Sequence, residues 1–98
     1  MAEYRVGGAF DAKARRQVEW IEANRPDLQP VPVIKAGDPL VHLVITLDAD
    51  DEEDALAQAE DAFQESEHHA GVSASDAGPT GMEVWLVSED PPAIYQPS

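Results

Sequence analysis

Three groups of residues in this chain could take part in chemistry: its histidines, a pair of adjacent glycines and a large excess of carboxylates. Glu65 and His69 are four residues apart, a spacing that places both side chains on one face of a helix, where they can share a divalent cation. A protein metal site needs three or four converging ligands, and no other histidine has a matching spacing. We therefore expect no metal and no other cofactor, and we interpret His42 as a half-exposed strand residue rather than a catalytic base.

The sequence gives little evidence for an anion-binding site or for catalysis. Gly7 and Gly8 precede a segment that begins with three cations, and a glycine turn before a helix N-terminus can bind an anion, although no phosphate-loop pattern is present. The three cations oppose the helix dipole, so we expect acids of a second helix to offset them. The chain has no cysteine, no evident pair of nucleophile and base, and no nucleotide fingerprint, so a catalytic role is not expected.

The charge of the chain is strongly negative and unevenly distributed. Its formal net charge is −14, and all Lys and Arg residues lie in residues 1–37. Such a field repels phosphates and acidic lipids, so direct nucleic-acid or membrane binding is not expected. Asp54, Asp61 and Glu65 form a stripe that imitates a nucleic acid toward a basic protein, or that simply faces solvent. Adaptation of the sequence to salt explains the acidity equally well.

Two tryptophans indicate association with a partner. Trp20 falls outside the predicted apolar face of its helix, close to Arg16, and aromatic residues beside arginine often anchor interfaces. A connector or tail that folds over Trp20 is the alternative. The sheet face away from the helices is predicted to carry apolar side chains: Trp85, Val87, Val44 and Ile34. An exposed face of this kind favours a homodimer or another protein partner.

The elements that must position these residues follow from hydrophobic periodicity. Alternating apolar residues predict strands, spacings of three and four predict helices, and Gly and Pro mark the breaks. The predicted elements are a strand over 3–10, a helix over 11–24, strands over 31–35 and 40–49, a helix over 50–70, a mobile loop over 72–81 and a strand over 82–87. The pair Gly7-Gly8 is expected to soften the first strand, as a bulge does. In the second helix, Asp50 is the predicted N-cap and Gly71 the stop.

The order strand, helix, strand, strand, helix, strand is that of the ferredoxin-like split βαβ arrangement. We expect an α+β domain over residues 1–90, with a four-stranded antiparallel sheet, two helices on one of its faces and a proline-rich tail over 91–98 that is loose or docks through Ile94 and Tyr95. This fold hosts many functions and transfers none.

The residues therefore favour a small, acidic, non-catalytic interaction module, expected in the cytoplasm, that self-associates or joins an assembly. Two alternatives remain open. One is an acidic mimic that blocks a basic nucleic-acid-binding protein. The other is a small enzyme or metabolite sensor that uses a cleft between the sheet and the loop over residues 72–81.

Overall fold

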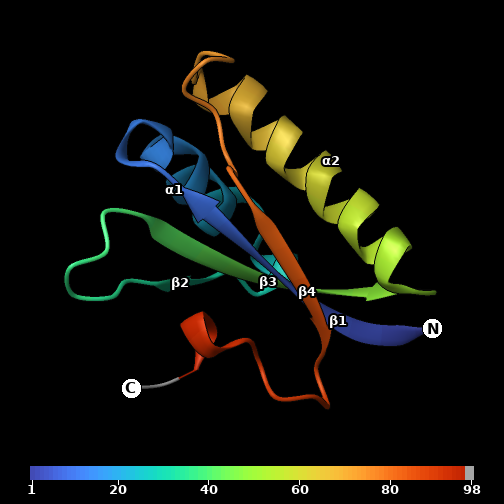
Figure 1. The fold of residues 1–98 in the computed structure, drawn as a ribbon. Helices are drawn as coiled ribbons and strands as arrows, with labels where there is room; N and C mark the ends of the chain where they lie inside the picture. Colours follow the sequence, from blue (N-terminus) through green and yellow to red (C-terminus); the bar gives the residue numbers. More distant parts are fainter. Residues whose placement is uncertain (97–98) are drawn as a thin grey trace.

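A computed structural model describes residues 1–96 and confirms the predicted fold class. Within these residues the elements run in the predicted order: β1 (Ala2–Phe10), α1 (Arg15–Asn24), β2 (Val31–Val33), β3 (Val41–Ala49), α2 (Glu52–Ala70) and β4 (Met82–Leu86). The sheet has the order β2-β3-β1-β4, with every neighbouring pair antiparallel, as in ferredoxin-like folds. Both helices cover one face of the sheet, and the C-terminal segment lies on the other (Figure 1).

The two central strands pair along their whole length without a bulge. Gly7 lies opposite Val44 and Gly8 opposite Leu43, in an unbroken register from Ala2 to Phe10. The predicted bulge is therefore wrong, and so is the anion-binding turn, because both glycines lie inside a regular strand. Gly8 faces the core instead, where an added methyl group would meet side chains of the core.

Each helix starts and ends at residues with a clear physical role. The first helical segment opens with a short 3-10 turn, where Asp11 accepts a hydrogen bond from the Lys13 backbone N–H at 2.9 Å. In α2 the N-cap is Asp51, one residue later than predicted, and its carboxylate accepts from the Asp54 N–H at 2.8 Å. Gly71 ends α2 in the left-handed conformation that favours glycine, as predicted.

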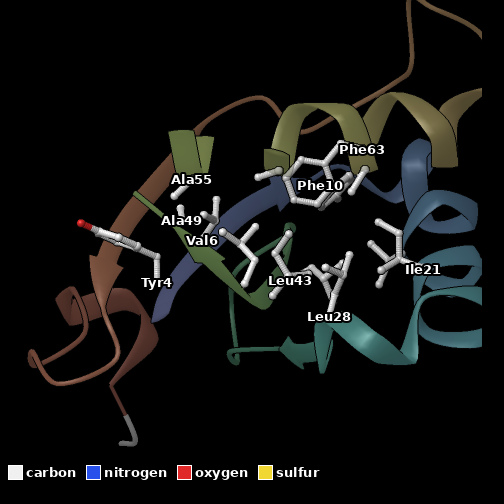
Figure 2. Packing of buried hydrophobic residues seen from close by; sticks show 14 of the residues in the cluster. Tyr4, Val6, Phe10, Ile21, Leu28, Leu43, Ala49, Ala55 and Phe63 are labelled. Carbon is white, nitrogen blue, oxygen red and sulfur yellow. The ribbon is translucent and has the colours of Figure 1, made fainter. Parts of the chain in front are cut away.

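The core lies between the helices and the sheet (Figure 2). Phe10 of β1 meets Phe63 of α2 edge to face, with ring centroids 5.3 Å apart. The apolar faces of the two helices and of β3 supply much of this cluster: Val18, Ile21, Leu43, Ile45, Leu47 and Phe63. Leu56 of α2 is only partly buried against it.

A buried glutamine joins the two helices to the loop after α2. The Gln17 amide donates to the Phe63 carbonyl at 3.1 Å, to Ser66 Oγ at 3.2 Å and to the Gly78 carbonyl at 3.0 Å. Its carbonyl oxygen accepts from the Gly78 N–H at 2.8 Å. Ala9 adds backbone hydrogen bonds to Thr80 and Gly81, so the second half of the loop predicted to be mobile is tied to the domain.

Candidate functional site

The strongest candidate site is the sheet face opposite the helices. Strand alternation sends Tyr4 and Val6 into the core, and therefore directs Arg5 and Gly7 to this second face. The register adds the side chains of β3 and β4 that flank them: His42, Val44, Thr46 and Trp85. Trp85 and Val44 were predicted here, and the structure places them here. Val87 follows the end of β4 and donates its N–H to the Glu3 carbonyl at 3.1 Å.

The C-terminal segment covers this face with one aromatic ring. Residues Ala93–Tyr95 form a 3-10 turn that lies beneath the sheet (Figure 1). The Tyr95 ring centroid is 5.1 Å from that of Trp85 and 5.6 Å from that of His42, which it meets edge to face. A side-chain carbon at Gly7 would overlap the Tyr95 ring, so the glycine provides the floor of the slot.

The tail was expected to be loose or to dock through Ile94 and Tyr95. Tyr95 docks, whereas Ile94 stays 36% exposed. Pro97 and Ser98, the end of the predicted tail, lie outside the described residues. Burial raises the pKa of Tyr95 to about 12, with a smaller contribution from the negative charge of Glu83.

His42 is buried, with an exposed fraction of 4%, rather than half-exposed as predicted. The tail covers it from the side that an open sheet would leave to water. Its Nε2 lies 2.9 Å from Asp38 Oδ2, and because an ionised carboxylate only accepts, Nε2 carries the proton. Hydrogen bonds from the Leu40 N–H and, second, from His42 lower the pKa of Asp38.

The cover leaves two buried polar atoms without a hydrogen bond. His42 Nδ1 and Trp85 Nε1 have no partner among the described residues, and both belong to rings that contact Tyr95. A buried polar atom without a partner costs about 1–3 kcal/mol. The tail therefore fits this face by shape but does not satisfy its polar groups.

Two neighbouring cavities lie beside Tyr95. The smaller, of about 260 Å³, is lined by Arg5, Gln29, Val31, Val33, Val44, Thr46, Trp85, Pro91 and Tyr95. The larger and more open one, of about 630 Å³, is lined by Pro32, Val33, Ile34, Lys35, Ala36, Tyr95 and Gln96. They share Val33 and Tyr95, and we call them together the tail groove. Their lining includes two cations and, within residues 1–96, no Asp or Glu, although the chain has 20 acids.

The acids gather in cavities outside the tail groove. A cavity of about 290 Å³ contains Glu3, Asp27 and Asp48 in its wall. Another, of about 200 Å³, lies beside residues 78–79 and contains Glu60 and Glu67. This last one corresponds to the cleft that the sequence suggested between the sheet and the loop over residues 72–81.

Trp20 is half-buried against the core rather than exposed. Its ring lies parallel to that of His69 in α2, at 5.2 Å between centroids and an angle of 5°. Arg16, which the sequence placed close to Trp20, is exposed. The pair considered for a metal, Glu65 and His69, has other partners: His69 stacks on Trp20, and Glu65 accepts a hydrogen bond from Arg25 at 3.4 Å.

Two of the three acids in the predicted stripe form contacts within the domain. Asp54 accepts from the Asp50 N–H at 3.0 Å and belongs to the N-terminal cap of α2, while Glu65 pairs with Arg25. Asp61 is exposed, as expected. The cations that α2 was expected to offset lie at the start of α1, whereas the ion pair forms at its end, with Arg25. Mimicry of a nucleic acid stays a prediction.

Sequence reasoning missed the pairing of Gly7 with Tyr95 and the role of Arg5. A glycine in the middle of a well-formed strand, combined with an aromatic residue in the tail, is the signal that could have pointed to this slot. Among the described residues no helix is long and apolar enough to cross a membrane. No family model, no curated protein and no solved structure matches this chain, so its function must be argued from the site alone.

Proposed function

We propose that this domain is a non-catalytic binding module that takes a small molecule in the tail groove. The observation that carries the proposal is the incomplete cover: Tyr95 occupies a slot that Gly7 makes possible, yet Trp85 Nε1 and His42 Nδ1 stay unpaired beneath it. A ligand in the groove whose acceptor reaches the Trp85 indole N–H supplies the hydrogen bond that the tail does not.

The size and chemistry of the groove support a small ligand. Small-molecule sites are concave and largely apolar, with a few polar groups that fix orientation. The smaller cavity has this composition, since three valines and two aromatic rings surround Arg5, Gln29 and Thr46. Its volume of about 260 Å³ lies just below the usual range of about 300–1,000 Å³, which suits a small ligand of about ten non-hydrogen atoms.

Self-association through Trp20 or Trp85 stays a prediction with less support than the sequence suggested. Trp85 has an exposed fraction of only 5%, and Trp20 stacks on His69 within one chain. An interface that used Trp85 would first require the tail to leave its slot.

A titration of the full chain with two probes tests the proposal. Phenylacetate and phenylacetamide each have about ten non-hydrogen atoms, and a ligand of that size is expected to bind with a dissociation constant of about 1 mM. We expect amide resonances of Arg5, Val44 and Trp85 to shift in heteronuclear NMR spectra when either probe is added.

A blocking variant and its control complete the experiment. Val33→Trp places a bulky ring at a position that lines both cavities and should remove the shifts, whereas Ala57→Trp, at an exposed position of α2, should leave them unchanged. Absence of shifts in the groove with both probes, or shifts that survive Val33→Trp, would contradict the proposal.

A further inference from the structure

We infer that the ligand of the tail groove is a small organic anion, a carboxylate on an apolar or aromatic body, and that Arg5 binds its charged group. This inference rests on the proposed binding function and adds the chemical class of the ligand. It follows from the distribution of charge, from the donors in the smaller cavity and from the shape of its apolar part.

The tail groove is lined by positively charged side chains. In a chain with 20 acids and six Lys and Arg, the lining includes Arg5 and Lys35 and, among the described residues, no carboxylate. Lys35 lines the larger and more open cavity, where its Nζ donates one hydrogen bond to the Gln96 carbonyl at 2.9 Å, and it does not line the smaller cavity that contains Arg5. Within residues 1–96 Arg5 has no carboxylate oxygen within 4.0 Å, the distance that defines the ion pairs elsewhere in the structure. Arg5 is therefore the cation that is available to an anionic ligand.

Several side chains that line the smaller cavity are hydrogen-bond donors. An arginine guanidinium only donates, and so does an indole N–H. Trp85 lines the same cavity as Arg5, lies directly opposite it in the register of β1 and β4, and holds a buried Nε1–H without an acceptor. The Thr46 hydroxyl, opposite Arg5 on β3, adds a third group that can donate. A carboxylate is acceptor-only, has two oxygens and matches this set.

The rest of the lining of the smaller cavity is largely apolar. Val31, Val33 and Val44 form one side, and the Trp85 and Tyr95 rings form another. Flat rings and branched aliphatic groups pack well against such walls. The combination of one cation with an apolar, partly aromatic wall selects amphipathic anions over inorganic ions such as phosphate.

The overall negative charge of the protein does not prevent this binding. At an ionic strength near 0.15 M, exposed charges more than about 8 Å apart are largely screened from each other. This screening applies to the acids of α2, on the other face of the sheet, but not to Glu3, Asp48 and Glu83, which the register places on the same face as Arg5. The repulsion from these three acids is offset by direct contact between the ligand and the Arg5 guanidinium.

The test compares phenylacetate with its uncharged amide, using affinities from NMR titrations of the full chain at this ionic strength. We expect phenylacetate to bind about tenfold more tightly, as a hydrogen-bonded charge pair implies. Arg5→Gln should abolish the preference, and Arg5→Lys should keep part of it. Arg16→Gln produces the same change in net charge at an exposed position of α1 and should leave the preference intact.

A further variant tests the indole donor. Trp85→Phe keeps an aromatic wall but lacks the N–H, and it should weaken phenylacetate binding several-fold while changing phenylacetamide binding less. A preference for phenylacetate that survives Arg5→Gln would overturn the inference.

The remaining outcomes separate the two proposals. Equal binding of the two probes in the tail groove would overturn the anion class and leave the binding function standing. Failure of both probes to bind there would overturn the proposed function, and the inference with it.

Discussion

Replacing Gly7 with alanine isolates the contact between the strand and the tail. The Gly7 backbone does not lie in the left-handed region, so alanine fits the strand itself. Removing a glycine from the middle of a strand should stabilise the folded state by about 0.5–1 kcal/mol. The added methyl group would however overlap the Tyr95 ring and force the tail out of its slot.

The magnitude follows from the contacts that the tail would lose. Tyr95 meets two rings, those of Trp85 and His42, and aromatic pairs contribute about 0.5–1.5 kcal/mol each. Loss of both pairs costs about 1–3 kcal/mol, from which the backbone gain is subtracted. We therefore expect Gly7→Ala to lower the free energy of unfolding by at most about 2 kcal/mol, because undocking of the tail also returns the unpaired Trp85 Nε1 and His42 Nδ1 to water.

The assay is urea unfolding of a double-mutant cycle with Tyr95→Ala, because such a cycle isolates the interaction between two positions. Without the Tyr95 ring the overlap disappears, and Gly7→Ala should then be stabilising. Gly81→Ala is the control, since its added carbon meets nothing within 4 Å, and its effect should be the same in both backgrounds. If Gly7→Ala shifts the free energy of unfolding by the same amount with and without Tyr95, the docked tail is not a property of the protein in solution.

Three further predictions concern the tail, the buried amide and the cap of α2. Burial raises the pKa of Tyr95 from 10.0 to about 12, so the stability that its docking supplies is complete below pH 10 and is lost as the pH rises through about 12. In a Tyr4→Phe background, where Tyr95 is the only tyrosine, tyrosinate absorbance should therefore rise near pH 12; a rise near pH 10 would mean an undocked ring. Gln17→Leu should lower the free energy of unfolding in urea by about 2–4 kcal/mol, because it leaves the buried backbone groups that the Gln17 amide pairs without a hydrogen bond. A loss below about 0.5 kcal/mol, which is ordinary for a surface substitution, would show that water takes the place of the amide. Asp51→Ala should lower the free energy of unfolding by about 1 kcal/mol, and Asp50→Ala should lower it much less. If thermal melts show the larger loss for Asp50→Ala, Asp50 is the N-cap instead.

Local patterns predicted most of the fold. The alternation along residues 41–49 and the helical spacing of residues 52–70 each have a buried side, and burial of those sides fixes the sheet and the helix that covers it. The N-cap of α2 was misplaced by one residue because Asp50 and Asp51 are adjacent and have the same chemistry.

Trp20 lies closer to the core than its place outside the apolar face suggested, because the buried side of α1 includes a polar residue. Gln17 is fully buried, and residues three apart lie on neighbouring parts of one helix face. The buried side of α1 therefore extends toward Trp20, which packs at its edge and stacks on His69.

The covered sheet face could not be predicted from spacing alone. Its slot depends on a residue without a side chain, Gly7, and on a ring 88 positions later in a proline-rich segment that has no periodicity. The apolar character of Trp85 and Val44 was visible in the sequence, but periodicity shows only that a face is apolar. It does not show whether a second chain or the same chain covers it.

The most direct test of the account follows the two indole N–H resonances while phenylacetate is added to the full chain. Trp85 lines the tail groove with an unpaired Nε1–H, whereas Trp20 lies on the helical side of the sheet. We expect a downfield shift of the Trp85 indole proton that saturates with ligand, with the Trp20 signal unchanged. An unmoved Trp85 signal at saturating phenylacetate, or equal shifts of both indoles, would contradict it.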